Sequence, residues 1–289
     1  MQPFAYARPE TLDEAVSLLA ERGSEARVLA GGTDLVIRLR DGSMAPGLVV
    51  DVKRIPELAP GIRAGADGSL VIGATTVMTD IAAHPVIRRD LAALADAAAV
   101  VGSVQIRNRA TLAGNLCNAS PAADTAPALL VHGAIVVAAG PDGVRRILLD
   151  DFFVRSGVTT LVPGELVVAV EIPGPASRIA SAHQRRTRRR GHDLASVTVT
   201  VGIDASGVTR LAFGSVGPRP LLRVDSSGIL ADPTASDEAR VVVLEALVAD
   251  ASPSLRSMRA GPEYRLAMLR VLARRAVGVA LERHAAGEA

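Results

Sequence analysis

The sequence has too few residues of several kinds to build some common classes of site. A single cysteine among 289 residues excludes an intrachain disulfide, and it also excludes an iron–sulfur cluster or zinc site made from this chain's own thiolates. The five histidines include no pair at a zinc-ligand spacing. We therefore expect no metal site in this chain.

Long apolar runs are missing as well. No run approaches the roughly 18 apolar residues that indicate a membrane-spanning helix. The N-terminal residues, MQPFAYARPE, lack the charged and then apolar pattern of a signal peptide. We therefore expect a cytoplasmic protein with no membrane span.

Aromatic residues are scarce, which argues against a nucleic-acid partner. The chain has no Trp, four Phe and two Tyr, so few side chains could stack on bases, and its formal net charge is only +2. One arginine-rich segment, HQRRTRRRGHD at residues 183–193, has no aromatic residues among its arginines. Such a segment is typical of a solvated or subunit-facing surface, and we expect no nucleic-acid binding.

The motifs of three large enzyme classes are absent. No G-x-G-x-x-G opens a βαβ unit, which argues against a nicotinamide-binding Rossmann domain. The sequence also contains neither the phosphate-loop motif G-x-x-x-x-G-K-[ST] nor the hydrolase motif G-x-S-x-G. No catalytic triad or carboxylate pair stands out, so we predict no catalytic residue of that kind.

The composition that remains is that of a globular chain with two domains. Hydrophobic residues make up 49% and charged residues 21%, and the length suffices for two domains of ordinary size. The order of predicted elements is α/β up to the proline-rich segment IPGPAS and α+β after it. We place one domain at 1–175, with lobes at about 1–55 and 56–175, and a second domain at 176–289.

The residues after this boundary favour a small α+β domain. The apolar runs LASVTVTVGID and VTRLAFGSV predict an antiparallel strand pair that turns at residues 205–207. Two helices are expected to follow, over residues 236–248 and from 262 to about 283. Apolar side chains at 264, 268, 271 and 272 predict the buried face of the second helix.

The segment VLAGGTDL, residues 28–35, predicts a strand that enters a Gly31-Gly32 turn and then a short helix capped by Thr33. Glycines let a ligand approach the main chain, and free N–H groups at a helix start attract phosphate. A purely structural strand–Gly-Gly–helix turn is also common. The motif alone therefore leaves both interpretations open.

A second polar turn occurs in RNRATLAGNLCNASPAAD, residues 107–124. Small residues from Thr111 to Asn115 suit a close turn, and we expect a helix over residues 121–132 that carries Asp124 in its first turn. The Asp124 carboxylate either favours the helix dipole or accepts hydrogen bonds from ligand hydroxyls. Cys117 has no neighbouring base, so we expect a buried or half-buried thiol without chemistry.

Four motifs together carry a resemblance to a known family: AGGTDL, QIRNRATLAGNLCNASPAADTAPAL, DDFFVRSGVTTLVPGELVVAVEIP and YRLAMLRVLARRAV. The chain resembles, over almost its whole length, the FAD-binding subunit of molybdenum hydroxylases, the group that includes xanthine dehydrogenase and aerobic carbon monoxide dehydrogenase. The resemblance implies an α+β fold. It consists of a two-lobed FAD-binding domain of the vanillyl-alcohol-oxidase (PCMH) type, followed by a smaller domain with an antiparallel sheet flanked by helices.

The same resemblance implies a set of cofactor-binding residues. Two loops would hold the pyrophosphate of FAD, an acidic residue would bind an FAD hydroxyl, an aliphatic residue would pack on the isoalloxazine, and a basic residue would lie near the flavin edge. In this sequence they are Ala30, Gly31, Gly32, Thr33 and Asp34; Thr111, Ala113, Gly114 and Asn115; and Asp124, Leu161 and Arg185.

The chain departs from the family pattern at three positions. The second loop usually reads T-x-G-G-N, and Ala113 stands where the first glycine is expected. The second domain often opens with Tyr-x-Lys, and His183 and Arg185 occupy those places. A methyl at position 113 is compatible with FAD if the backbone φ there is negative, and Arg185 keeps the positive charge in a different shape.

The function implied by the resemblance is that of an FAD-dependent oxidoreductase subunit. It would take electrons from a small subunit with [2Fe–2S] clusters, in a complex with a large molybdopterin subunit, and pass them to an external acceptor. Two alternatives stay open: a stand-alone FAD-dependent oxidoreductase that acts on a small molecule or NAD(P)H, and a flavin-free scaffold subunit.

Overall fold

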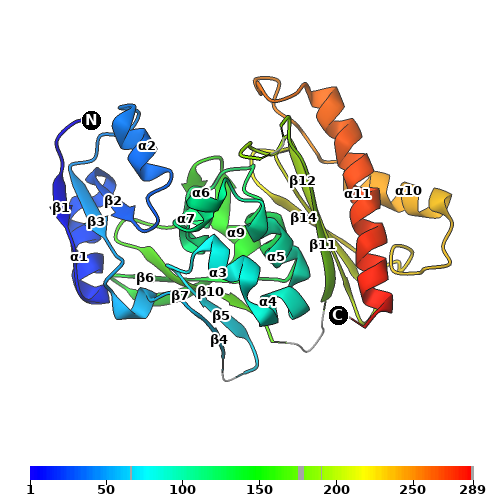
Figure 1. Ribbon diagram of the computed structural model, residues 1–289, viewed down its shortest axis with the longest axis horizontal. Coiled ribbons are helices and arrows are strands. Elements are labelled where there is room, and N and C mark those ends of the chain that lie inside the picture. The colour runs from blue at the N-terminus through cyan, green and yellow to red at the C-terminus, as the bar shows by residue number, and fades with distance from the viewer. Residues whose placement is uncertain (66, 175–178, 190, 288–289) are drawn as a thin grey trace.

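The computed structural model describes residues 1–65, 67–174, 179–189 and 191–287. Among the described residues the three largest of four sheets follow one another across the molecule, and helices lie between and beside them (Figure 1). We call the parts built on them the first lobe, the second lobe and the C-terminal domain. The predicted boundary at residues 175 and 176 lies outside the described residues.

The first lobe holds a three-stranded parallel sheet in the order β1-β3-β2, at the left of Figure 1. Its elements are β1 (Ala5–Ala7), α1 (Leu12–Arg22), the 3-10 helix η1 (Gly23–Glu25), β2 (Ala26–Leu29), α2 (Leu35–Arg40), β3 (Leu48–Asp51) and the 3-10 helix η2 (Pro56–Leu58). Thr11 caps the first helix, since its Oγ1 accepts a hydrogen bond from the Glu14 N–H at 3.2 Å.

The second lobe holds a five-stranded antiparallel sheet in the order β4-β5-β10-β6-β7, with most of its helices toward the middle of the molecule (Figure 1). Strands β4 and β5, and likewise β6 and β7, pair as antiparallel hairpins. The elements are β4 (Ile62–Ala64), β5 (Leu70–Gly73), α3 (Met78–Ala83), α4 (Pro85–Asp90), α5 (Ala92–Ala99), α6 (Val104–Arg107), α7 (Leu112–Cys117), α8 (Thr125–Val131), β6 (Ile135–Gly140), β7 (Gly143–Leu148), α9 (Leu149–Phe152), β8 (Phe153–Arg155), β9 (Val158–Thr159) and β10 (Leu166–Ile172).

The C-terminal domain holds a four-stranded antiparallel sheet in chain order, β11-β12-β13-β14. Its elements are β11 (Ile179–Arg186), β12 (Val197–Asp204), β13 (Thr209–Gly214), β14 (Leu221–Asp225), α10 (Asp237–Leu247) and α11 (Pro262–Ala285). The long helix α11 packs on β11 and β12, while α5 and α8 of the second lobe also pack against this sheet. The predicted antiparallel sheet flanked by helices is therefore confirmed.

Two local predictions are wrong in detail. Thr33 does not cap α2, because Asp34 occupies the cap position and makes no side-chain cap bond there. The helix expected from Pro121 begins only at Thr125, after a turn.

The buried face predicted for the last helix is also wrong. Tyr264 and Val271 are exposed, and among the four predicted positions only Leu272 is buried. The buried residues of α11 are Arg265, Leu269, Leu272, Ala273, Ala276, Val277 and Ala280. Small alanines on this face let the helix lie close to the sheet, and a pattern search for large apolar residues overlooks them.

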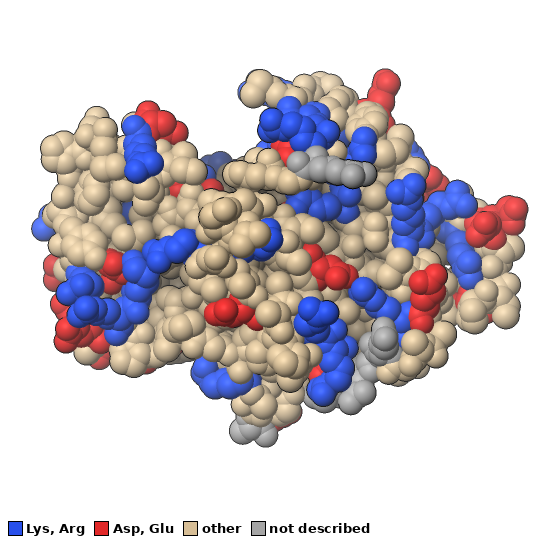
Figure 2. All heavy atoms as spheres, viewed as in Figure 1, with Lys and Arg blue, Asp and Glu red and all other residues tan. Residues whose placement is uncertain are grey.

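Acidic and basic side chains are interspersed on the face that Figure 2 shows. Several form ion pairs, such as Arg223 with Asp250 at 2.6 Å and Arg283 with Asp96 at 3.1 Å. The second of these joins α11 to α5 across the contact between the C-terminal domain and the second lobe. Among the described residues no helix is both long enough and apolar enough to cross a bilayer.

The contact between the second lobe and the C-terminal domain contains a buried histidine. His132 follows α8, is 7% exposed, and its Nε2 lies 3.1 Å from Ser181 Oγ of β11. Burial, helped by the charge of Arg210, lowers the pKa of His132 to about 4 from 6.5. The imidazole is therefore neutral at physiological pH.

This neutral imidazole predicts a loss of stability in mild acid. Between pH 6.5 and 4 the unfolded chain binds a proton at His132 that the folded chain does not bind, so folding free energy falls as the pH drops through that window. We expect His132 to account for about 2 kcal/mol of lost stability between pH 7.5 and 5. Urea unfolding of the wild type and of His132→Gln at both pH values measures it, and a difference between the two proteins that does not change with pH would contradict it.

Candidate functional site

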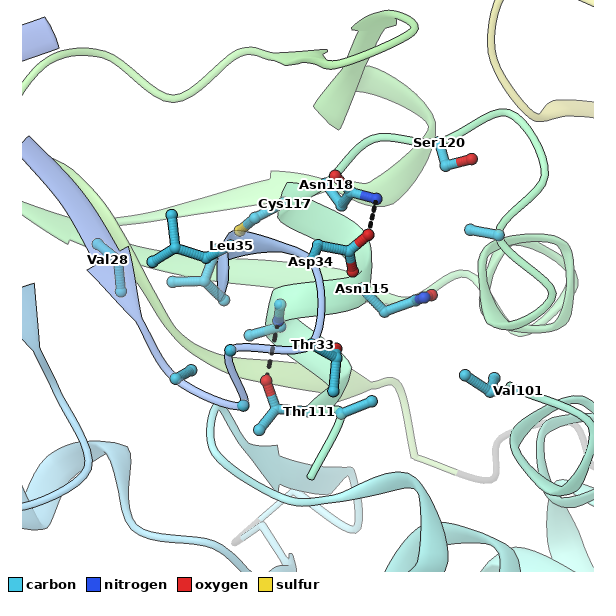
Figure 3. Close-up of a pocket in the computed structure, with 18 of the residues that line it drawn as sticks. Val28, Thr33, Asp34, Leu35, Val101, Thr111, Asn115, Cys117, Asn118 and Ser120 are labelled. Atoms are coloured by element: carbon cyan, nitrogen blue, oxygen red, sulfur yellow. Dashed lines mark hydrogen bonds between the residues drawn. The ribbon is translucent and has the colours of Figure 1, made fainter. Parts of the chain in front are cut away.

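A cleft of about 700 Å³ lies between the first and second lobes and reaches the start of the C-terminal domain. Both predicted turns line it (Figure 3). Eleven of the twelve predicted site residues line this cleft: Ala30, Gly31, Gly32, Thr33, Asp34, Thr111, Ala113, Gly114, Asn115, Asp124 and Leu161. The twelfth, Arg185, does not line it. Among the described residues no group of His, Cys, Asp and Glu could hold a metal ion.

The first turn follows β2 and comes very close to the second lobe. A Cβ on Gly31 would lie 2.1 Å from the main-chain oxygen of Arg109, so only glycine fits there. Gly32 has a φ of +76°, which side chains other than glycine rarely adopt. Among the described residues no hydrogen-bond partner is present for the N–H groups of Gly32, Thr33 and Asp34. The turn therefore presents free main-chain donors to the cleft.

The second turn is the beginning of α7. Thr111 caps this helix, and its Oγ1 accepts from the Gly114 N–H at 3.2 Å. A Cβ on Gly114 would lie 2.8 Å from the same hydroxyl, so the glycine makes room for the cap. Ala113 lies in the first turn of the helix and is not among the residues of positive φ. Its methyl therefore causes no backbone strain at the position where the family pattern has glycine.

Polar side chains join the two turns across the cleft. The Asn118 side chain donates from Nδ2 to Asp34 Oδ1 at 3.3 Å (Figure 3). It also accepts at Oδ1 from Arg38 Nη2 at 2.8 Å. Asp34 and Arg38 belong to the first lobe, whereas Asn118 follows α7 in the second. This bridge holds the loops of the two lobes together. Arg38 was not predicted as a site residue, because its role depends on a contact 80 residues away.

Cys117 lies on the wall of the cleft, and its predicted burial is wrong. The side chain is exposed to solvent and lines the cavity. Protein atoms crowd around it on the remaining sides, and the resulting desolvation raises the pKa of the thiol to about 12. The thiol is therefore open to solvent on the cleft side and stays protonated at neutral pH. A protonated thiol is a poor nucleophile, which argues against a cysteine active site in this cleft.

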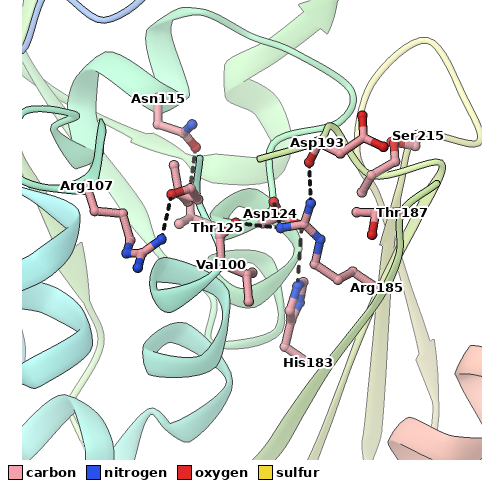
Figure 4. Close-up of polar contacts among 12 residues, drawn as sticks. Val100, Arg107, Asn115, Asp124, Thr125, His183, Arg185, Thr187, Asp193 and Ser215 are labelled. Atoms are coloured by element: carbon pink, nitrogen blue, oxygen red, sulfur yellow. Dashed lines mark hydrogen bonds and ion pairs between the residues drawn. The ribbon is translucent and has the colours of Figure 1, made fainter. Parts of the chain in front are cut away.

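Asp124 sits at the inner end of the cleft, where the second lobe meets the C-terminal domain. It is 7% exposed and stands just before α8, yet its side chain makes no cap bond to that helix. Instead Asp124 Oδ2 lies 3.2 Å from Arg185 Nη1, and Asp124 Oδ1 lies 3.6 Å from His183 Nε2 (Figure 4). The carboxylate is therefore held by strand β11 rather than by the dipole of α8.

Arg185 contacts Asp124 but does not itself line the cleft. Its guanidinium also donates to the main-chain oxygens of Val100 at 2.5 Å and Asp193 at 2.6 Å. These bonds fix its position at the seam between the second lobe and the C-terminal domain. The structure thus places this basic residue where it contacts the cleft lining through Asp124 and the main chain of Asp193.

Two family models match the chain and cover most of it. Residues 2–175 match the FAD binding domain in molybdopterin dehydrogenase, and residues 182–280 match the CO dehydrogenase flavoprotein C-terminal domain.

Curated relatives match over nearly the whole chain. It is 33% identical over 285 residues to the carbon monoxide dehydrogenase medium chain of Hydrogenophaga pseudoflava, which covers 97% of this chain and 98% of the relative. It is 31% identical over 282 residues to the xanthine dehydrogenase FAD-binding subunit of Escherichia coli O157:H7, with 96% of each chain covered.

Solved structures agree with these matches. A chain of the reconstituted CO dehydrogenase from Oligotropha carboxidovorans superposes with a TM-score of 0.89 at 30% identity, covering 98% of this chain and 99% of that one. A chain of quinoline 2-oxidoreductase from Pseudomonas putida 86 gives a TM-score of 0.85 at 27% identity, with 97% and 98% covered.

Proposed function

This chain belongs to the family of FAD-binding medium subunits of molybdenum hydroxylases, and from that membership we propose that it relays electrons from [2Fe–2S] clusters of a partner subunit to an external acceptor. Its cofactor is FAD, and it is an oxidoreductase subunit. We further propose that a small [2Fe–2S] subunit and a large molybdopterin subunit complete the complex. The cytoplasmic location stays a prediction.

The cleft suits FAD in shape and in chemistry. The free N–H groups of the first turn and the start of α7 line the same cleft, which suits a pyrophosphate bound at both. Gly31 keeps the two lobes close enough for both turns to reach one ligand. The cleft also extends past the half-buried Leu161, where an aliphatic side chain can pack on a flat ring system.

The protein's own residues bind and orient the cofactor. Asp124 offers its carboxylate to a ligand hydroxyl at the inner end of the cleft, and the bridge from Asn118 to Asp34 holds the two turns in register. FAD itself, when bound, accepts electrons singly and releases them in pairs. A relay of this kind needs a placed flavin rather than an acid–base pair, which agrees with the residues that line the cleft.

The convergence of both predicted turns on one cleft is the observation that carries this proposal. Its test is to purify the complex that forms around this chain in its native cells and to measure FAD, iron and molybdenum per chain. We expect all three, and we expect reduction of the iron–sulfur centres to be followed by bleaching of the flavin band. A yellow monomer or homodimer with turnover of its own would support the stand-alone oxidoreductase instead.

Replacing the Cys117 thiol is expected to have only a small effect on FAD binding and reduction. We expect Cys117→Ser to change FAD affinity and the rate of flavin photoreduction by less than about twofold, since a thiol with a pKa near 12 takes no part in bond making. Flavin content after purification measures retention of FAD, and the time course of photoreduction measures its rate. A serine variant that keeps its flavin yet is no longer reduced would contradict this assignment.

A further inference from the structure

Strand β11 presents a row of polar side chains to the second lobe. Because side chains alternate along a strand, Ser181, His183 and Arg185 share one face, and Ala182 packs into the core of the C-terminal domain on the other. Ser181 Oγ accepts from the Ala93 N–H at 3.2 Å and contacts His132, while the next two members of the row meet Asp124. Residues of the C-terminal domain thus hold the Asp124 carboxylate, which belongs to the second lobe.

Two buried polar atoms in this row face each other without another partner. His183 Nε2 and Asp124 Oδ1 are 3.6 Å apart, and each is buried with no hydrogen bond among the described residues. The His183 side chain is only 3% exposed, and that of Asp124 is 8% exposed. A buried polar group without a partner is costly, and a shift of about half an ångström would bring this pair into hydrogen-bond range.

The other side of the imidazole fixes which nitrogen carries the proton. His183 Nδ1 lies 2.9 Å from Thr200 Oγ1, whose hydroxyl can donate to it. A proton on Nδ1 alone would leave the lone pair of Nε2 aimed at a carboxylate oxygen, which is repulsive. The arrangement therefore favours Nε2–H pointing at Asp124, and the same side chain donates no bond elsewhere.

We propose that His183 is a positioning residue of the cofactor site, whose Nε2–H holds Asp124 Oδ1 while Arg185 holds Oδ2, so that β11 sets the orientation of the carboxylate toward FAD. Each carboxylate oxygen has two lone pairs, so the contacts with His183 and Arg185 leave lone pairs that can accept a hydrogen bond from a ligand hydroxyl. The inference rests on the proposed placement of FAD in the cleft.

Two amide substitutions distinguish the contribution of Nε2 of His183 from that of Nδ1. The amide nitrogen of glutamine is as many bonds from Cα as Nε2, and that of asparagine as many as Nδ1. We expect His183→Asn to raise the dissociation constant of FAD roughly tenfold, since it loses a bond to a charged group, and His183→Gln to raise it less than about threefold. Titration of the apoprotein, followed by flavin fluorescence, measures both, and thermal unfolding confirms that each variant is folded.

A double-mutant cycle shows whether His183 acts through Asp124. In the Asp124→Asn background we expect His183→Asn to change the dissociation constant less than about twofold, because the carboxylate that it positions is gone. An equal effect in both backgrounds, equal effects of the two amide substitutions, or no effect of His183→Asn in the otherwise unaltered protein would each overturn the proposal.

Nitrogen-15 NMR of the imidazole tests the same point without a substitution. We expect neutral His183 in the intact protein to carry its proton on Nε2, and a proton on Nδ1 alone would overturn the proposal. Failure of the underlying placement looks different. If Gly31→Ala retains FAD as tightly as the wild type, the cleft does not hold the cofactor, whereas loss of FAD from Gly31→Ala with an Nδ1–H tautomer defeats this inference alone.

Discussion

Replacing Gly31 with alanine is expected to strip FAD from the protein. A Cβ at this position would lie 2.1 Å from the Arg109 oxygen, far inside contact distance, and that oxygen belongs to the rigid main chain just before the second turn. The two turns must therefore separate, and a ligand held by both loses one of them. We expect the dissociation constant to rise at least about a hundredfold, equal to about 2.8 kcal/mol.

Gly278 provides the matched control for this substitution. It lies in α11, and a Cβ there would meet nothing within 4 Å. Gly278→Ala should therefore keep wild-type affinity, and α11 should gain slightly in stability. Flavin content after gel filtration and fluorescence titration of both apoproteins measure the difference. Equal FAD retention by the two alanine variants would contradict the role of the first turn.

Removing the Asp124 carboxylate is expected to destabilise the seam between the second lobe and the C-terminal domain. Arg185 is 13% exposed in its side chain and has Asp124 as its only carboxylate partner among the described residues. Taking away one partner of a buried ion pair leaves an uncompensated charge, which costs roughly 3 kcal/mol. We expect Asp124→Ala to lower the free energy of unfolding by about this amount, as measured by urea unfolding of the apoprotein.

The double variant Asp124→Ala/Arg185→Met separates the lost charge pair from lost packing. Methionine fills much of the space of the arginine stem without its charge, so most of the stability should return. FAD affinity should stay weak in both variants, because neither has the carboxylate. A double variant no more stable than Asp124→Ala would show that the destabilisation has another cause.

The local features of the cofactor site could be predicted from the sequence because each depends on neighbouring residues. Glycines 31 and 32 mark a turn that no other residue can make, and Thr111 lies three residues before Gly114, whose N–H it caps. The same holds for α1, whose cap pairs Thr11 with Glu14. Such short spacings specify local geometry directly.

Features that depend on distant parts of the chain could not be predicted in this way. The contacts of His183 and Arg185 with Asp124 join residues about 60 positions apart. Strand β11 itself was not predicted, because its arginines resemble a polar loop. The start of α8 was misplaced, since Pro121 suits a first helical position but here lies in a turn whose carbonyl accepts from the Ser215 N–H. Tertiary contacts override local preference in each case.

Hydrogen–deuterium exchange of the apoprotein, with and without FAD, tests the central claim most directly. The free N–H groups of residues 32–34 and that of Ala113 at the start of α7 should both exchange more slowly when FAD is bound, and riboflavin, which lacks the pyrophosphate, should protect neither segment. Protection of both segments by FAD alone is the predicted result. FAD binding that leaves both segments unprotected would contradict the account.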